Sequence, residues 1–101
     1  MTLNDYESKV INWAKNRGIL EKSTPEKQLI KCYEELGELS EGLLKSNDHL
    51  FKDGVGDTLV TLILLCNLKG TDLTECLHYA YTEIANREGK MVNGVFVKNP
   101  S

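Results

Sequence analysis

The chain contains an acidic stretch, Glu34-Glu35-Leu36-Gly37-Glu38, with three carboxylates in five residues. On a helix, Glu38 is a neighbour of both Glu34 and Glu35, because residues three and four positions apart lie on the same side. Like charges at this spacing repel each other by a few tenths of a kcal/mol on an exposed face. A solvated helix tolerates that repulsion, and a bound cation would replace it with attraction.

A second pair of carboxylates, Asp53 and Asp57, follows one helix later. Consecutive helices joined by a short turn pack antiparallel. Glu38 precedes the turn by about ten residues and Asp57 follows it by about ten, so we expect the two acidic groups at the same level. Facing carboxylates are costly without a cation. Oxygen ligands without a nearby His or Cys suit Mg²⁺ or Mn²⁺, and protein-bound Mg²⁺ usually also holds phosphate. The alternative is a solvated acidic face.

Four helices are predicted, over about residues 4–17, 24–45, 48–68 and 72–89, followed by a short tail with a turn at Asn93-Gly94. We expect Asn4 or Asp5 to cap the first helix, and residues 19–22 to be a connector. The core stripe expected for the second helix is Leu29, Tyr33, Leu36, Ser40 and Leu43. The segment 59–68 is apolar almost all round, so it must be buried on most sides. A chain of 101 residues can hardly enclose it, and we therefore expect an oligomer.

The composition predicts one domain, residues 1–101, with a net charge of −3. Residues 34–57 alone carry seven acids and two bases, a local charge of −5, which disfavours nucleic acid as a partner. The longest apolar run is far too short to span a bilayer, and the N-terminus lacks a signal pattern. Neither a disulfide framework nor a zinc site is suggested by the three cysteines, which we expect to be buried and reduced: Cys32, Cys66 and Cys76. These features predict a cytoplasmic protein that binds neither nucleic acid nor membrane.

The pattern Gln28-x-x-Lys31-x-x-Glu34-Glu35-x-x-Glu38, followed by Gly56-Asp57 at the start of an apolar helix, resembles the MazG-like proteins. These belong to the all-α nucleoside triphosphate pyrophosphohydrolases. The resemblance covers nearly the whole chain, from Trp13-Ala14-x-x-Arg17-Gly18 to Phe96-Val97-Lys98. The family hallmark is Glu-Glu-x-x-Glu followed by Glu-x-x-Asp. The second half departs here, because Gly54 stands at the Glu position and Asp53, one residue earlier, is the candidate substitute.

The resemblance implies an all-α, four-helix MazG-like bundle with a short extended C-terminal tail, assembled as a homodimer or a dimer of dimers. It also implies Mg²⁺-dependent cleavage, with Mn²⁺ as the alternative ion, between the α- and β-phosphates of an NTP or dNTP. The products would be a nucleoside monophosphate and pyrophosphate, as in enzymes that cleanse the nucleotide pool. The implied metal ligands are Glu35, Glu38, Asp53 and Asp57, and Glu34 or Glu38 would position or deprotonate the attacking water. The implied substrate-binding residues are Lys31, Asn86, Arg87 and Lys90 for the phosphates, and Trp13 or a Tyr for the base.

Each supporting residue also has a structural interpretation. Trp13 lies on a helix stripe typical of core residues, and Lys31 has the spacing to pair with Glu34 or Glu35. Arg87 and Lys90 are cations near a helix C-terminus. The spacing Glu75-x-x-His78 occurs in di-iron bundles, but those need a second such motif, and position 46, three before His49, is Ser.

The second functional class is a helical nucleotide- or protein-binding module of the same fold, without turnover because Gly54 replaces the family Glu.

Overall fold

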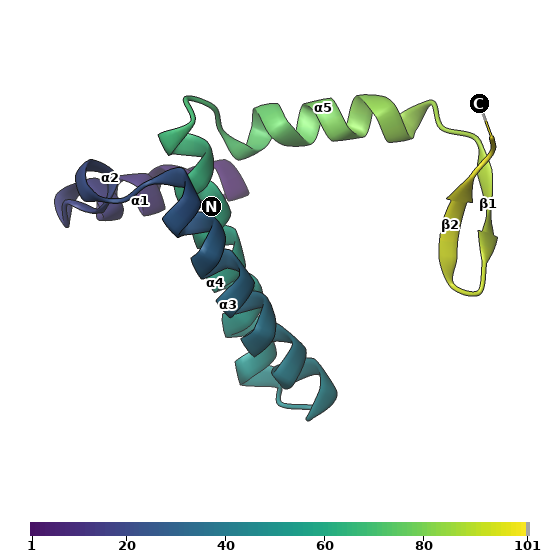
Figure 1. Cartoon of the computed structure of the whole chain (residues 1–101), viewed down its shortest axis with the longest axis horizontal. Coiled ribbons are helices and arrows are strands. Elements are labelled where there is room, and N and C mark those ends of the chain that lie inside the picture. The colour runs from purple at the N-terminus through teal and green to yellow at the C-terminus, as the bar shows by residue number, and fades with distance from the viewer. Residues whose placement is uncertain (101) are drawn as a thin grey trace.

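The computed structural model describes residues 1–100 and is mostly α-helical, as the sequence predicts (Figure 1). None of the helices in this range is long and apolar enough to cross a membrane. The elements, in chain order, are α1 (Leu3–Asn16), α2 (Ile19–Lys22), α3 (Pro25–Leu44), α4 (Asp48–Leu68), α5 (Leu73–Ala85), β1 (Gly89–Val92) and β2 (Val95–Lys98).

The long helices α3 and α4 form a closely packed antiparallel hairpin (Figure 1). Thr24 caps α3 by accepting the backbone N–H of Lys27 at 3.2 Å. Two glycines allow the close approach. A Cβ atom on Gly42 would lie 2.5 Å from the Phe51 backbone nitrogen, and one on Gly54 would lie 2.7 Å from the Leu39 Cα. The helix backbones therefore touch at these two positions, and larger residues there would separate them.

The predicted core stripe of α3 is wrong for the single chain. Its apolar members are 38–67% exposed: Leu29, Tyr33, Leu36 and Leu43. The buried residues of α3 are instead Gln28, Cys32 and Gly42, and Gly42 lies directly against Phe51 of α4. The reason is that α3 has apolar residues on two faces, and the face with small residues is the one that permits close packing. The segment 59–68 of α4 has no exposed residue, as predicted.

Helix α1 packs across α4, and α2 lies against both. The cap of α1 is Thr2, with Asp5 as its capping-box partner, rather than Asn4 or Asp5. The segment expected to be a connector is the one-turn helix α2. Glu7 is buried, and its Oε2 accepts the backbone N–H of Leu73 at 2.9 Å. This carboxylate therefore joins α1 to the positive N-terminal end of α5.

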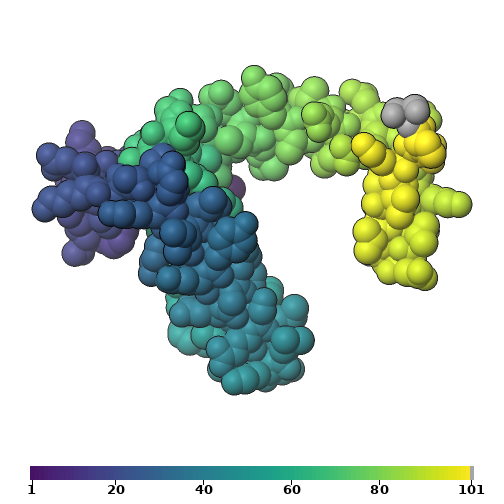
Figure 2. Space-filling view, viewed as in Figure 1, coloured from purple at the N-terminus to yellow at the C-terminus, as the bar shows by residue number. Residues whose placement is uncertain are grey.

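The segment from α5 to β2, which we call the C-terminal arm, extends away from the other helices (Figures 1 and 2). Helix α5 ends at Ala85, earlier than predicted, and the expected tail is an antiparallel hairpin that turns at Asn93-Gly94, both with positive φ. Every residue from 74 to 100 is exposed. The radius of gyration is 16.1 Å, against about 13 Å for a compact chain of this length. One chain therefore does not close a four-helix bundle, because α5 packs on the others only at its start.

Candidate metal centre

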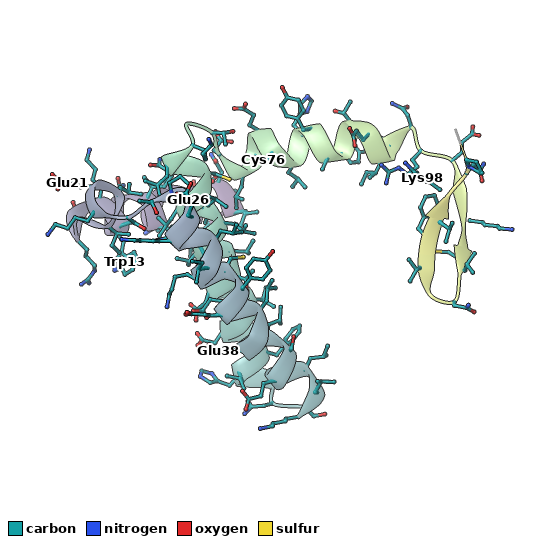
Figure 3. All side chains as sticks on the ribbon, viewed as in Figure 1. Trp13, Glu21, Glu26, Glu38, Cys76 and Lys98 are labelled. Atoms are coloured by element: carbon teal, nitrogen blue, oxygen red, sulfur yellow. The ribbon has the colours of Figure 1, made fainter. Side chains whose placement is uncertain are left out.

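Three carboxylates meet where α3 and α4 lie side by side. Glu35 and Glu38 come from α3, one helical turn apart, and Asp57 comes from α4. One oxygen atom from each lies within 4.8 Å of those from the other two. Glu38 is labelled in Figure 3, where it lies on the hairpin and far from the C-terminal arm. The antiparallel hairpin therefore brings the Glu-x-x-Glu pair level with Asp57, and we call these three side chains the acidic cluster.

Glu35 is a partly buried member of the acidic cluster. Its side chain is only 14% exposed, and its Oε2 atom is buried without a hydrogen-bond partner among the described residues. Burial raises the pKa of the Glu35 carboxyl above its ordinary value, and the charges of Glu38 and Asp57 raise it further. A buried, unpartnered carboxylate oxygen is costly in a native protein. A cation at this place would supply the missing partner.

The pKa of Asp57 is raised for similar reasons. This residue is half-buried, and burial raises the pKa of its carboxyl, with added contributions from the charges of Asp53 and Glu38. Lys31 offsets this repulsion in part, and it lowers the pKa of both Asp57 and Glu35. Its Nζ lies 3.4 Å from Glu34 and 4.0 Å from Glu35. One lysine at this distance leaves the acidic cluster with a net negative charge.

The remaining residues predicted near the metal lie at the edge of the acidic cluster. Asp53 is exposed and outside the three-carboxylate group, although its charge affects Asp57. Glu34 is 61% exposed and paired with Lys31. Trp13 is half exposed rather than part of the core, with the Arg17 guanidinium 5.3 Å from its ring centre. It shares an open hollow of about 330 Å³ with Asp57 and the residues Tyr6, Lys9, Val10 and Val60.

The sequence interpretation missed Tyr6 and Lys9 as neighbours of the acidic cluster. The sequence pattern that could have identified them is the helical spacing that places both on the same side of α1 as Trp13. Their closeness to the carboxylates also depends on the packing of α1 on α4. This hollow combines the rings of Tyr6 and Trp13 with a lysine and a carboxylate. A planar ligand could stack on a ring, and an anionic group on that ligand could pair with the lysine.

The predicted phosphate-binding residues of the C-terminal arm lie far from the acidic cluster of the same chain: Asn86, Arg87 and Lys90 (Figure 1). The Asn86 side chain donates to the Thr82 carbonyl at 3.4 Å, and the Arg87 guanidinium lies 3.8 Å from Glu83. Both contacts stay within the arm. A single chain therefore does not bring these residues to the carboxylates.

The residues present fit a hard divalent cation. The acidic cluster offers oxygen atoms only, and Mg²⁺ and Mn²⁺ prefer such donors. The buried Glu35 Oε2 atom has a free lone pair at the same place. Together they make this cluster the candidate metal centre.

Replacing Glu35 with Gln is expected to stabilise the metal-free protein at neutral pH. A carboxyl with a raised pKa in the folded state lowers stability as the pH rises above about 4, since the unfolded chain loses the proton more easily. Gln removes that dependence. In thermal unfolding with EDTA at pH 7, Glu35→Gln should melt a few degrees higher, at roughly 4–8 °C per kcal/mol. Adding Mn²⁺ should raise the Tm of the wild type and not that of the variant, because binding stabilises the folded state. An equal response of both proteins to Mn²⁺ would contradict the role of Glu35.

Comparison with known proteins identifies the fold. No family model matches the chain. Over 60 residues it is 42% identical to an uncharacterized 18.2 kDa protein from the rep-hol intergenic region of Haemophilus phage HP1. That match covers 59% of this chain and 37% of the phage protein, so the chain spans little more than a third of that relative.

Among solved structures, the chain is similar to a cyanophage S-2L MazG-like pyrophosphohydrolase bound to dGDP and three catalytic Mn²⁺ ions per active site. The TM-score is 0.72 at 20% identity, and the match covers 100% of this chain and 96% of the cyanophage protein. A match over all of this chain and nearly all of the cyanophage protein at this score reflects a shared topology rather than a shared local motif. The chain therefore has the MazG-like fold that its Glu-Glu-x-x-Glu and Gly-Asp motifs predicted.

Proposed function

We propose that this protein is a metal-dependent nucleotide pyrophosphohydrolase. It would hydrolyse the bond between the α- and β-phosphates of an NTP or dNTP, releasing a nucleoside monophosphate and pyrophosphate. The observation that carries the proposal is the buried, unpartnered Glu35 Oε2 atom inside a cluster of three carboxylates. The fold supports it, since the cyanophage protein with this fold binds dGDP and Mn²⁺. Mg²⁺ is the proposed ion, and Mn²⁺ is the alternative.

Glu35, Glu38 and Asp57 would hold the metal, with Asp53 beside them. When bound, the metal would offset phosphate charge and favour ionisation of water. Glu38 is the exposed member of the acidic cluster, so its carboxylate can hold the attacking water by a hydrogen bond and accept its proton. Glu34 pairs with Lys31 and would keep that lysine beside the phosphates. This arrangement favours Glu38 over Glu34 as the general base.

The substrate's base would lie in the hollow beside Asp57. Trp13 offers an exposed ring there for stacking, and Lys9 offers a positive charge. The hollow borders the acidic cluster through Asp57 itself. A nucleotide in it would place its phosphates next to the carboxylates that hold the metal.

Asn86, Arg87 and Lys90 would reach a substrate only in an oligomer, a homodimer or a dimer of dimers. Two features support assembly. The apolar residues Leu29, Tyr33 and Leu43 of α3 are exposed, and over the described residues the C-terminal arm extends away from the hairpin beyond the start of α5 (Figure 1). We propose that the arm of one copy lies near the acidic cluster of another. We also propose that the enzyme acts in the cytoplasm and on free nucleotides. The charge of −5 over residues 34–57 supports free nucleotides as substrates, because it would repel nucleic acid.

The test is pyrophosphate release from a panel of NTPs and dNTPs with Mg²⁺ or Mn²⁺. The expected products are equal amounts of monophosphate and pyrophosphate from at least one nucleotide, and none with EDTA. Release of inorganic phosphate, or no turnover of any nucleotide, would overturn the proposal. Nucleotide binding without turnover would favour the second candidate, the non-catalytic module. Gly54 stands where the family has a Glu, and the close packing there leaves no room for a side chain.

Replacing Asp53 with Asn is expected to weaken the response to metal. Asp53 adds negative charge beside Asp57 from an exposed position, so it would act as a supporting ligand. We expect activity at limiting Mg²⁺ to fall by about 10- to 100-fold and to recover partly at high Mg²⁺. Asp48→Asn is the matched control, because Asp48 is also exposed on α4 and pairs with Lys52 at 3.0 Å. Full activity of Asp53→Asn at limiting metal would remove Asp53 from the site.

A further inference from the structure

Two cysteines meet at the junction between α4 and the C-terminal arm. Cys66 lies near the end of α4 and Cys76 in the first turns of α5, and their Sγ atoms are 3.8 Å apart. Both are free thiols. The residues between them end one helix, turn at Gly70, which has a positive φ, and start the next. The fold therefore places two thiols side by side, one on each side of the turn that connects α4 to the C-terminal arm.

The two thiols differ in their access to solvent. Cys66 is buried and Cys76 is exposed. Both line an open hollow of about 440 Å³ at the start of α3, together with Pro25, Leu29 and Lys69. A small molecule in this hollow has readier access to Cys76 than to Cys66, because Cys76 is exposed and Cys66 is buried. The acidic cluster shares no lining residue with this hollow.

We propose that Cys76 and Cys66 form a thiol modification site that takes a low-molecular-weight disulfide, such as oxidised glutathione, and ends as a reversible disulfide between α4 and α5. This inference is independent of the proposed hydrolase activity. It rests on the distance between the two sulfurs, the difference in their exposure and the hollow that both line.

The reaction proceeds by two thiol–disulfide exchanges. The Cys76 thiolate attacks one sulfur of oxidised glutathione, and a glutathione thiolate leaves. Cys66 then loses its proton to solvent and attacks the Cys76 sulfur, and the second glutathione thiolate leaves. Two protein thiols are oxidised to one disulfide, and one glutathione disulfide is reduced to two thiols.

The order of attack follows from the surroundings of each sulfur. Burial raises the pKa of Cys66 to about 11, with contributions from Cys76, Glu7 and Asp72, so Cys66 is almost entirely protonated while Cys76 is free. The contribution of Cys76 is lost once its sulfur carries glutathione, which favours ionisation of Cys66 in the second step. Cys76 is the exposed sulfur and therefore reacts first. A disulfide needs a sulfur separation near 2.05 Å, so side-chain rotation must bring the sulfurs closer by about 2 Å. The bond formed would fix the first turns of α5 against α4, close to the Glu7–Leu73 hydrogen bond that joins the start of α5 to α1.

Peptide mass mapping tests the site on the full chain. The reduced protein is treated with oxidised glutathione under native conditions at neutral pH, quenched with acid, unfolded and alkylated with N-ethylmaleimide. Trypsin cleavage after Lys69 separates the two cysteines, and cleavage after Lys31 releases Cys32 in a third peptide. We expect peptides 53–69 and 70–87 to be joined, with Cys32 alkylated and the bond reversed by dithiothreitol. Full alkylation of Cys66 and Cys76, or a bond mainly between Cys76 residues of two copies, would overturn the proposal.

Single substitutions test the order of the two steps. Cys66→Ser should retain glutathione on Cys76, because no second thiol is present to displace it. Cys76→Ser should leave Cys66 free to be alkylated after unfolding. Cys32→Ser is the control and should form the same bond as the wild type, since Cys32 lies on α3 outside this hollow. Glutathione found on Cys66 in Cys76→Ser, and not on Cys76 in Cys66→Ser, would contradict the order. Circular dichroism verifies that each variant is folded.

Discussion

Replacing Glu38 with Gln is expected to reduce kcat by about 10²- to 10⁴-fold, the range typical of a lost general base. Gln keeps the size of the side chain but removes the negative charge and the ability to accept a proton from water. Glu38 is exposed and belongs to the acidic cluster, so the loss falls on the chemistry rather than on the fold. Removing one of three like charges should leave the thermal stability without metal unchanged or slightly higher.

The measurement is pyrophosphate release at saturating nucleotide and metal, with nucleotide binding followed separately by titration. Glu41→Gln is the matched control. Glu41 lies on α3 one turn after Glu38, is exposed, and pairs with Lys45 at 2.8 Å outside the acidic cluster. The Glu41→Gln variant loses one negative charge from the same helix as Glu38→Gln, and its kcat should match that of the wild type. An equal loss in both variants would mean that net charge, and not the position of Glu38, controls turnover.

The sequence predicted the hairpin that positions the acidic cluster, and the reason is local. Pro25 and the Thr24 cap define the start of α3, and Gly70 follows the end of α4. With the start and end of each helix known, the rise per residue places Glu38 and Asp57 at the same level. The structure accordingly brings Glu35, Glu38 and Asp57 together. The spacing rules hold here because all three residues lie on two regular helices joined by a short turn.

The faces of α3 could not be assigned from the sequence. Periodicity identifies an apolar stripe, but it does not say which neighbour covers it. Leu29, Tyr33 and Leu43 formed the stronger stripe, whereas α4 packs on the face that contains Cys32 and Gly42. Close packing of helix backbones depends on where the small residues lie, and a hydrophobic pattern does not identify the face that carries them.

Contacts between residues distant in the sequence were also beyond prediction. Glu7 and Leu73 are 66 positions apart, and nothing in the local pattern around Glu7 marks it as the partner of a helix N-terminus. The direction of the C-terminal arm depends on this contact and on the turn at Gly70. The proximity of Cys66 to Cys76 follows from the same turn, and their spacing gave no motif. Spacing within a helix is fixed by its geometry, but the angle between helices is set by tertiary contacts.

Replacing Gly54 with Glu, which restores the family's Glu-x-x-Asp pattern, is expected to destabilise the protein rather than improve it. A Cβ atom at position 54 would meet the backbone of Leu39 at 2.7 Å, and backbone atoms cannot move aside as a flexible side chain would. The two helices would have to separate, at a cost of about 1–3 kcal/mol or more for overpacking. Separation would also move Asp57 away from Glu35 and Glu38. We therefore expect a Tm lower by roughly 10 °C and weaker binding of Mn²⁺.

Gly56→Ala is the matched control for this substitution, because Gly56 lies on the same helix with no neighbouring atom within 4 Å of its Cβ position. Alanine there should stabilise α4 by up to about 1 kcal/mol, since glycine is a poor helix residue. Gly54→Ala should destabilise, because its methyl group alone makes the contact with Leu39. Thermal unfolding of the three variants, with and without Mn²⁺, separates the two explanations for Gly54. If Gly54→Glu were as stable as the wild type and faster in turnover, position 54 would be a place where the family's metal ligand has been lost. If it unfolds more easily, Gly54 is the residue that allows α3 and α4 to approach closely enough to bring their carboxylates together.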